Sequence, residues 1–326
     1  MQPDQRQVND SKPPQLEETD RWFCTGTCPP DPGLATSDYF IDFTQQSSLP
    51  ANWTLANYET VTYGPNGATF TFNKRYDAPY IWTDFYFLFS TVEVVMQAAP
   101  GAGIISSSVL ISDDLDEIDW EFSGNNFGSS SGKVQTNYFG KGITGNYDRG
   151  TQPSVDSPQT EFHTYTINWT STSLTWSVDG TALRTLFAAD ADTDSHQYPQ
   201  TPMQLHLGLW DAGDADSSPA TVEWGGGYTD LSQAPFTMYV KSVRIVNSNP
   251  CGNYQYTDTS GTWQSIQCLD PGSNGTSVVT SGNSSATSPV PTSLNTDPVG
   301  PTQPNSGSVS TPRSSSTNSP SVSPHT

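Results

Sequence analysis

Three carboxylates stand at alternate positions in the run Asp116-Glu117-Ile118-Asp119-Trp120-Glu121-Phe122. A β-strand sends successive side chains to opposite faces, so Glu117, Asp119 and Glu121 would share one face. The apolar residues between them would take the other face. Like charges this close repel and cannot all stay ionised, which separates their pKa values. Two carboxyl groups with different pKa values are what acid/base chemistry needs.

The spacing of the two glutamates indicates one kind of chemistry. At a rise of roughly 3.3 Å per residue their Cα atoms lie about 13 Å apart, and each side chain can lean towards the other. The carboxyl groups could then approach the ~5–5.5 Å separation of a retaining glycosidase. Asp119, between them, could hydrogen-bond the nucleophile. A solvated acidic strand face and a calcium site are the alternatives.

Composition limits the partners of the chain. Charged residues make up 14 % of the 326 residues, and acids outnumber bases 33 to 12, for a net charge of −21. Such a charge argues against nucleic acid and anionic membranes, and suits an uncharged substrate. Aromatic residues reach 11 %, with nine tryptophans, which could stack on sugar rings or fill a core.

Four cysteines form two local pairs, Cys24/Cys28 and Cys251/Cys268. Their spacing fits two disulfides better than a zinc site, and disulfides indicate an oxidising compartment. No cofactor and no metal is expected. Five sequons agree with secretion, at Asn9, Asn52, Asn168, Asn274 and Asn283. No stretch is apolar enough to span a bilayer, and the polar N-terminus contains no signal peptide, so we expect that a leader is missing from this version of the chain.

The chain divides into three parts. Residues 1–18 are polar and are expected to be disordered. Residues 19–270 form one predicted domain. Residues 271–326 are dominated by Ser, Thr, Pro, Gly and Asn and read as a disordered, O-glycosylated stalk. The stalk ends without the hydrophobic tail of a lipid-anchor signal, so a lipid anchor would require a longer form.

Short alternating apolar runs predict an all-β domain, because Gly, Pro, Asn and Asp punctuate them and helical periodicity is nearly absent. The predicted fold is a β-jelly-roll sandwich of two curved antiparallel sheets, with the acids at the floor of a cleft on the concave face. The expected strands are Thr69–Phe72, Phe85–Met96, Ile104–Ile111, Val134–Phe139, Phe162–Trp169, Leu174–Val178, Met203–Trp210 and Met238–Val246.

Several other motifs have an ordinary structural explanation. The run Gly128–Gly132 matches a nucleophile elbow literally, but it lies in a Gly/Ser/Asn loop instead of a strand-to-helix turn. The acids of 190–194 begin like a calcium loop without its glycine or closing glutamate, so an exposed acidic loop is expected. His163 reads as a half-buried strand residue. Trp210 and Trp224 each close an apolar strand segment beside a Gly-rich loop, where they could either stack on sugar or pack in the core.

Taken together, these segments resemble the Crh-type transglycosylases of fungal cell walls, a branch of glycoside hydrolase family 16. The resemblance spans roughly Cys24 to Cys268. Besides the acid run, it rests on these stretches: Asp84–Tyr86, Val92–Met96, Ser112–Asp116, Gln135–Gly142, His163–Ile167, Tyr198–Met203, Phe236–Val243 and Ser260–Ile266.

The resemblance implies a β-jelly roll in which Glu117 is the nucleophile, Asp119 its helper and Glu121 the acid/base. It implies that chitin is cleaved to a covalent glycosyl-enzyme and that a β-glucan or chitin chain accepts the sugar, which cross-links the wall. Sugar contacts are expected from Glu121, His206, Trp210, Thr221, Asn137, Tyr138 and Trp224. Two positions depart from the pattern of the family: His206 stands where relatives usually carry a longer basic residue, and Asp211-Ala212 stands where small residues and glycine are usual.

Three functions remain open at this point: the transglycosylase, a retaining β-glucan or chitin hydrolase with the same residues, and an inactive wall-binding protein. The acids do not choose between water and sugar as acceptor. An intact acid triad argues against an inactive protein. A secreted, wall-bound monomer is the expected form.

Overall fold

The computed structural model describes residues 29–57, 59–124, 131–145, 147–193, 196–269 and 277–278. The predictions about the Cys24–Cys28 disulfide, the segment 1–18 and most of the stalk therefore lie outside the described residues, as does most of the Gly128–Gly132 loop. Within the predicted stalk, Ser277–Val278 pairs with the strand Ile266–Leu269, so regular structure extends past the expected boundary at residue 270.

The described chain is almost entirely β-structure, with two short α-helices, α1 (Ala188–Ala191) and α2 (Pro219–Trp224). Three 3₁₀ turns are Phe43–Gln45, Leu231–Gln233 and Trp263–Ser265. The strands are β1 (Asp31–Pro32), β2 (Asp38–Asp42), β3 (Trp53–Leu55), β4 (Val61–Gly64), β5 (Gly67–Phe72), β6 (Tyr80–Thr83), β7 (Ser90–Gln97), β8 (Gly101–Ser112), β9 (Glu117–Gly124), β10 (Ser131–Lys133), β11 (Gln135–Phe139), β12 (Ser154–Asp156), β13 (His163–Trp169), β14 (Ser173–Val178), β15 (Thr181–Phe187), β16 (Met203–Asp211), β17 (Phe236–Asn247), β18 (Asn253–Tyr256), β19 (Ile266–Leu269) and β20 (Ser277–Val278).

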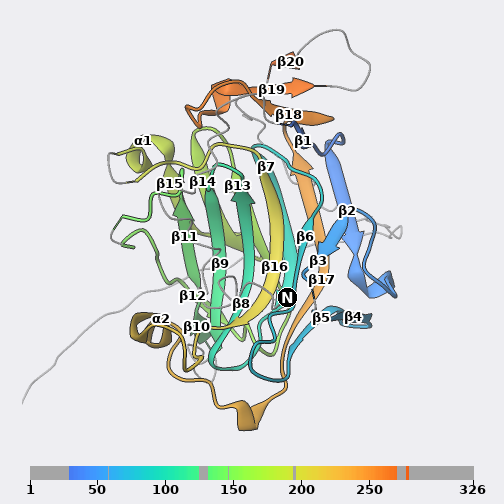
Figure 1. Ribbon diagram of the computed structural model, residues 1–326, viewed down its shortest axis with the longest axis vertical. Coiled ribbons are helices and arrows are strands. Elements are labelled where there is room, and N and C mark those ends of the chain that lie inside the picture. The colour runs from blue at the N-terminus through green and yellow to red at the C-terminus, as the bar shows by residue number, and fades with distance from the viewer. Residues whose placement is uncertain are drawn as a thin grey trace, which may run out of the picture. The chain divides into compact units, whose positions relative to one another are not determined.

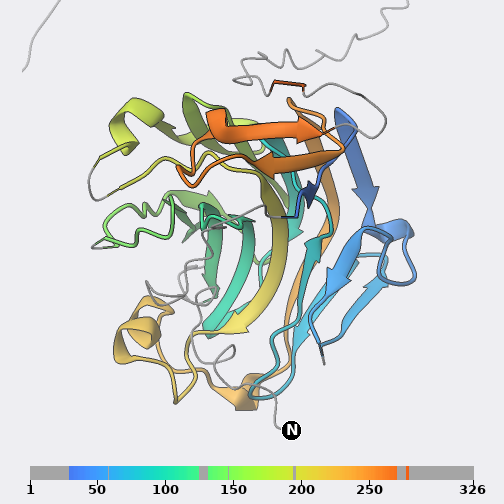
Figure 2. The same cartoon turned by 45° about the horizontal axis from the view of Figure 1, so that its top comes forward.

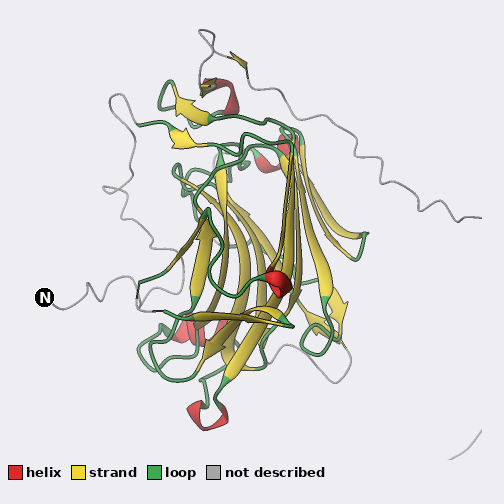
Figure 3. Cartoon of the chain, turned by 90° about the vertical axis from the view of Figure 1, so that its right-hand side faces the viewer, coloured by secondary structure: helices red, strands yellow, loops and turns green. Residues whose placement is uncertain are grey.

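Two curved antiparallel sheets form the body of the domain (Figures 1 and 3). The six-stranded sheet has the order β11-β9-β8-β16-β6-β3, and the larger sheet has the order β15-β14-β13-β7-β17-β5-β4, with β2 also paired to β17. This confirms the predicted jelly-roll sandwich. All eight predicted strands are present. One boundary is wrong: residues 85–89 precede β7, because Phe85, Phe87 and Phe89 are buried in a loop whose Phe89 has φ 54°.

The core lies between the two sheets and is rich in aromatic residues. Trp120 and Phe122 of β9 both contact the ring of Tyr165 on β13 edge-on, at centroid distances of 5.4 Å and 4.7 Å. Trp176 of β14 is fully buried against the same layer. Each such side chain removes a large apolar area from water, and truncating one to alanine would cost about 3–5 kcal/mol. The position of β9 is thus fixed by its apolar face.

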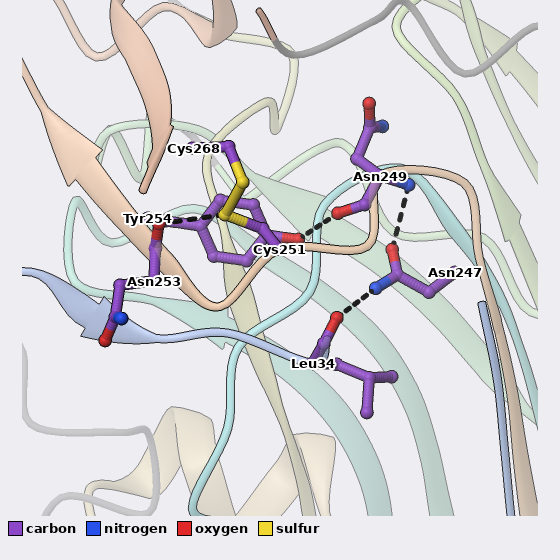
Figure 4. Close-up of a disulfide and its surroundings, with 7 residues drawn as sticks. All are labelled: Leu34, Asn247, Asn249, Cys251, Asn253, Tyr254 and Cys268. Carbon is purple, nitrogen blue, oxygen red and sulfur yellow. Dashed lines mark hydrogen bonds between the residues drawn. A yellow bond between two sulfur atoms is a disulfide. The ribbon is translucent and has the colours of Figure 1, made fainter. Parts of the chain in front are cut away.

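A small sheet, β1-β18-β19-β20, closes one end of the sandwich (Figure 2). The predicted disulfide between Cys251 and Cys268 is present, with Cα atoms 5.6 Å apart, and it ties β19 to the segment before β18. Figure 4 shows its surroundings: Asn247 Nδ2 donates to the carbonyl of Leu34 at 2.9 Å, and the Tyr254 hydroxyl donates to the carbonyl of Asn249 at 2.6 Å. The first of these contacts holds the end of β17 against Leu34, and the second closes the turn that leads into β18.

No helix in the described part of the chain has the length and apolar character that crossing a bilayer requires.

Candidate active site

The three acids stand on one face of β9, as the alternation predicts. Ile118, Trp120 and Phe122 belong to the core, whereas Glu117, Asp119 and Glu121 point to the opposite face of the six-stranded sheet. We call this opposite face the acid face. The ladders to β8 and β11 run through all three acids without a register shift, so no bulge turns one of them away. That the acid face forms a cleft stays a prediction.

The three acids differ in exposure. Asp119 is only 1 % exposed, while Glu117 and Glu121 on either side of it are partly exposed. A reagent approaching the acid face can therefore reach the two outer carboxyl groups but hardly the central one. This is the difference in access that the predicted roles of nucleophile, helper and acid/base require.

One row of side chains crosses the acid face through Asp119. In the ladder, Asn137 of β11 lies opposite Asp119, which lies opposite Val109 of β8. Val109 in turn lies opposite His206 of β16, and His206 lies opposite Trp82 of β6. Opposite residues of antiparallel strands share a face. Residues separated by more than 100 positions thus form one continuous surface.

His206 is held as a neutral imidazole. Its Nδ1 is hydrogen-bonded to the hydroxyl of Tyr80, and its ring stacks on Trp82 at 6.1 Å with an interplanar angle of 14°. Desolvation lowers the pKa of His206 to about 3. Within the described part of the chain, no hydrogen-bond partner reaches its buried Nε2 atom. Gly208 makes room for this arrangement, because a Cβ there would lie 2.5 Å from the Tyr80 ring.

A second row crosses the acid face through Glu121. Gln135 of β11 lies opposite Glu121, and Ser107 of β8 lies on its other side. The amide Nε2 of Gln135 donates to Glu121 Oε2 at 3.1 Å, and its Oε1 accepts from the indole Nε1 of Trp224 at 2.9 Å. The acid/base candidate is therefore linked through one amide to a tryptophan from another element.

Trp210 and Trp224 form a stacked pair, with ring centroids 5.7 Å apart and an interplanar angle of 11°. Trp210 lies on β16, as expected. The expectation that Trp224 closes a strand segment is wrong, because Pro219 at the helix start and the Ser218 cap make 219–224 the helix α2. Thr221 lies in the same helix, where its hydroxyl is 2.8 Å from the Ser218 hydroxyl. Both tryptophans are partly exposed.

Two arginines supply positive charge near the acids. Burial lowers the pKa of Arg149 and of Arg184, while the carboxylates of Glu117 and Asp119 oppose this for Arg149, and Asp119 does so for Arg184. Arg184 also donates from Nη1 to the carbonyl of Thr136 at 2.7 Å, which fixes it behind β11. These guanidinium groups offset the negative charge that β9 concentrates.

Asp116, the first acid of the run, has a structural place. It is fully buried and accepts hydrogen bonds from the backbone N–H of Lys141, Gln200 and Thr201 at 2.7–2.9 Å, and from the Thr201 hydroxyl. Burial raises the pKa of Asp116, and these hydrogen bonds oppose the rise. The carboxyl group pins two loops to the start of β9.

The neighbouring β11 residues Asn137 and Tyr138 point to opposite faces of the sheet. Asn137 lies on the acid face beside Asp119, where sequence reasoning expects it. Tyr138 was expected to contact sugar too, but it lies opposite Ile118 and belongs to the core, 3 % exposed. The strand alternation that places Asn137 on the acid face necessarily turns Tyr138 away from it. The expectation for Tyr138 is therefore wrong.

Sequence reasoning missed five residues around the acids: Tyr80, Trp82, Gln135, Arg149 and Arg184. Tyr80 and Trp82 carry a signal, since two aromatic residues at i and i+2 mark one face of a strand. Gln135 carries one too, because it precedes Asn137 by two positions. The arginines reach the site from loops and from the other sheet, and no local pattern announces them. Among the described residues, no cluster of His, Cys, Asp and Glu could hold a metal ion.

Comparison with known proteins agrees with this arrangement. Residues 49–226, more than half of the chain, match the family of glycosyl hydrolases family 16. Crh-like protein 5 of Aspergillus fumigatus is 55 % identical over 241 residues, which are 74 % of this chain and 59 % of that protein. The solved structure of apo Crh5 transglycosylase is 55 % identical, covers 75 % of this chain and 98 % of that one, and superposes with a TM-score of 0.69. A structure of Crh5 transglycosylase in complex with NAG is 54 % identical, covers 74 % of this chain and 97 % of that one, and has a TM-score of 0.70.

The chain therefore belongs to glycosyl hydrolase family 16, within its Crh-like group. It spans 59 % and 65 % of the length of two Crh-like proteins from Aspergillus fumigatus.

Proposed function

We propose that this protein is a retaining transglycosylase that cleaves chitin and transfers the glycosyl unit to β-glucan or chitin chains. The observation that carries the proposal is the acid face itself: two accessible glutamates flank a buried aspartate in a chain 55 % identical to the Crh5 transglycosylase. It would act outside the cell, in the fungal cell wall, where chitin and β-glucan chains meet. We expect it to act as a monomer.

The reaction uses the two glutamates in turn. In the first step Glu117 attacks the anomeric carbon while Glu121 gives its proton to the departing glycosidic oxygen. This leaves a covalent glycosyl-enzyme and a carboxylate at Glu121. In the second step Glu121 takes the proton of an acceptor hydroxyl, whose oxygen attacks the same carbon and releases Glu117. Two inversions give net retention.

Asp119 and the arginines prepare the strand for this chemistry. Asp119 lies between the glutamates and is only 1 % exposed, which suits the predicted role of a helper that hydrogen-bonds the nucleophile. The guanidinium of Arg149, near both Glu117 and Asp119, favours their ionised forms. An ionised Glu117 is the form that can attack carbon.

Sugar would bind along the rows that cross the acid face. His206 is expected to contact sugar as a neutral imidazole, which suits the uncharged hydroxyl and amide groups of chitin better than a cation would. Trp82, Trp210 and Trp224 present ring faces for stacking. The binding of NAG by a relative 54 % identical supports an amino-sugar ligand. Asn137 completes the contacts beside Asp119, and Thr221 contributes from α2.

The decisive experiment is incubation with chitin oligomers and a fluorescent laminarin-type acceptor, followed by sizing of the labelled products. Labelled products longer than the acceptor are expected. Shortened oligomers with no lengthened acceptor would instead identify a hydrolase with the same residues. No change in either pool, together with chitin binding, would identify an inactive wall-binding protein.

A further inference from the structure

Gln135 connects the acid/base candidate to the tryptophan pair. Its Nε2 donates to Glu121 Oε2 at 3.1 Å, and its Oε1 accepts from Trp224 Nε1 at 2.9 Å. Gln135 and Glu121 are also direct ladder partners, so their backbones are held at the spacing of neighbouring strands. The amide of Gln135 is thus hydrogen-bonded through both its nitrogen and its oxygen.

The indole decides which end of the amide faces Glu121. An indole N–H can only donate, so it requires the carbonyl oxygen of the Gln135 amide. The NH₂ group is then left for the carboxyl group of Glu121. A reversed amide would set NH₂ against the indole N–H and oxygen against the carboxylate, which loses both hydrogen bonds. The direction of donation at Glu121 is therefore fixed by Trp224.

The strand that carries Glu121 also anchors the indole. The carbonyl of Gly225, next to Trp224, accepts from the hydroxyl of Ser123 at 2.6 Å and from the N–H of Gly103 at 3.0 Å. Ser123 follows Glu121 by two residues on β9. Stacking on Trp210 restrains the ring itself. Helix α2 is consequently registered against the acid face.

We propose that Gln135 is a positioning residue for the acid/base: held by Trp224, its amide donates to the Glu121 carboxyl group and stabilises it in the ionised form. This inference deepens the proposed function, since it takes Glu121 as the group that exchanges the proton. Trp224 has, besides a ring face for sugar, a second task through its N–H.

The hydrogen bond changes strength as the proton moves. In the first step the proton passes from Glu121 to the glycosidic oxygen as the bond from that oxygen to the anomeric carbon breaks. The contact with Gln135 then becomes a charge-assisted hydrogen bond, which is roughly twice as strong as a neutral one. In the second step the carboxylate regains a proton from the acceptor hydroxyl. The amide therefore favours the transition state of the first step more than the protonated resting state.

Two substitutions separate the parts of this relay. Gln135→Leu removes both hydrogen bonds at similar volume, and Trp224→Phe removes only the indole N–H while keeping an aromatic ring on Trp210. The readout is the titration midpoint of the Glu121 carboxyl carbon by NMR in the free protein, assigned with Glu121→Gln. The midpoint is expected to rise by about one pH unit in Gln135→Leu and by less in Trp224→Phe. The double variant should match Gln135→Leu alone, because the indole acts through the amide. The alkaline limb of kcat/KM should move in the same direction.

Trp210→Phe is the matched control, since it changes the other ring of the stack and not the N–H that bonds Gln135. Its Glu121 midpoint should equal that of the unchanged protein, whatever happens to KM. An unmoved midpoint in Gln135→Leu would overturn the proposal. An unmoved midpoint in Trp224→Phe would overturn the part assigned to the indole, and this variant also serves if Gln135→Leu does not fold. Full activity of Glu121→Gln would instead refute the proposed role of Glu121 and leave the titration result standing, so the two failures are distinguishable.

Discussion

The indole of Trp176, on the larger sheet, donates a hydrogen bond across the core to the backbone carbonyl of Asp119 at 3.0 Å. Trp176 is fully buried, and the guanidinium of Arg184 lies 4.5 Å from its ring centroid. The backbone of the acid strand is thus held from behind, at its central acid, by a side chain of the opposite layer.

Replacing Trp176 with phenylalanine should therefore weaken both the fold and the site. The substitution keeps an aromatic ring but removes the donor to Asp119, at a cost of about 1–2 kcal/mol in the free energy of unfolding. We also expect kcat to fall several-fold, because the strand loses a restraint beneath Asp119. Denaturant unfolding and steady-state kinetics measure the two effects.

Trp169→Phe is the matched control, because Trp169 also donates from a buried indole to a carbonyl at 2.9 Å, but that carbonyl belongs to Pro199 and not to a residue of β9. A similar loss of stability with unchanged kcat is expected. Equal losses of kcat in the two variants would show that the Trp176 contact acts only through general stability.

Replacing Glu117 with glutamine should stop turnover while chitin binding survives. The amide cannot form the covalent intermediate, so kcat should fall by more than about 1,000-fold. Calorimetric titration with a chitin oligomer should give a Kd within a few-fold of that of the unchanged protein. Appreciable residual transfer would remove Glu117 from the role of nucleophile.

Asn137 and Tyr138 offer a direct test of the alternation along β11. Asn137→Ala should lower kcat/KM by about 10-fold or more, since the side chain lies on the acid face beside Asp119. Tyr138→Phe should leave kcat/KM unchanged, because its ring lies in the core. Oligomer kinetics for the two neighbouring variants decide the matter. A KM effect in Tyr138→Phe alone would contradict the placement of this strand.

Asp31 should make stability fall as the pH rises. Burial, with a smaller contribution from the charge of Asp113, raises the pKa of Asp31 from 3.8 to about 7. The folded protein thus keeps a proton that the unfolded chain loses above about pH 4, which favours unfolding increasingly between pH 4 and pH 7. Three pKa units would correspond to about 4 kcal/mol, and partial solvent exposure reduces this to about 1–2 kcal/mol.

Asp31→Asn removes the ionisable group and should therefore stabilise the protein at pH 7 but hardly at pH 4. Thermal melts across this range measure the difference. Glu161→Gln, at an exposed acid, is the control and should give no such pH-dependent gain. A constant difference between Asp31→Asn and the unchanged protein at all pH values would exclude the buried carboxyl group as its cause.

The disulfide between Cys251 and Cys268 should contribute to stability. It joins residues 17 apart, and closing a loop of this size is worth about 3 kcal/mol in the chain-entropy account. The double variant Cys251→Ser/Cys268→Ser should melt at a lower temperature than the unchanged protein, yet retain transfer activity at 20 °C or so. The pair Cys24→Ser/Cys28→Ser provides the comparison. If only the Cys24→Ser/Cys28→Ser variant melted at a lower temperature, the stability of the small sheet would not depend on the Cys251–Cys268 disulfide.

The sequence by itself determined the strand β9 and the common face of Glu117, Asp119 and Glu121. A two-residue period is a local property of the backbone, so seven residues suffice to read it. The same rule applies to β11. If Asn137 is assigned to the acid face, its neighbour Tyr138 must point into the core. The jelly roll and the Cys251–Cys268 pairing were likewise readable from short-range patterns.

Only the tertiary structure decided what surrounds the acids. Asp119 shares one row with His206, Trp82 and Asn137 because the order β11-β9-β8-β16-β6 sets distant segments side by side. The sequence of a single strand does not determine this order. Trp224 reaches Gln135 from a helix, not from a strand, since a serine cap and a proline begin α2. Strand alternation fixes which side chains share a face, while long-range pairing and packing fix which of those faces meet.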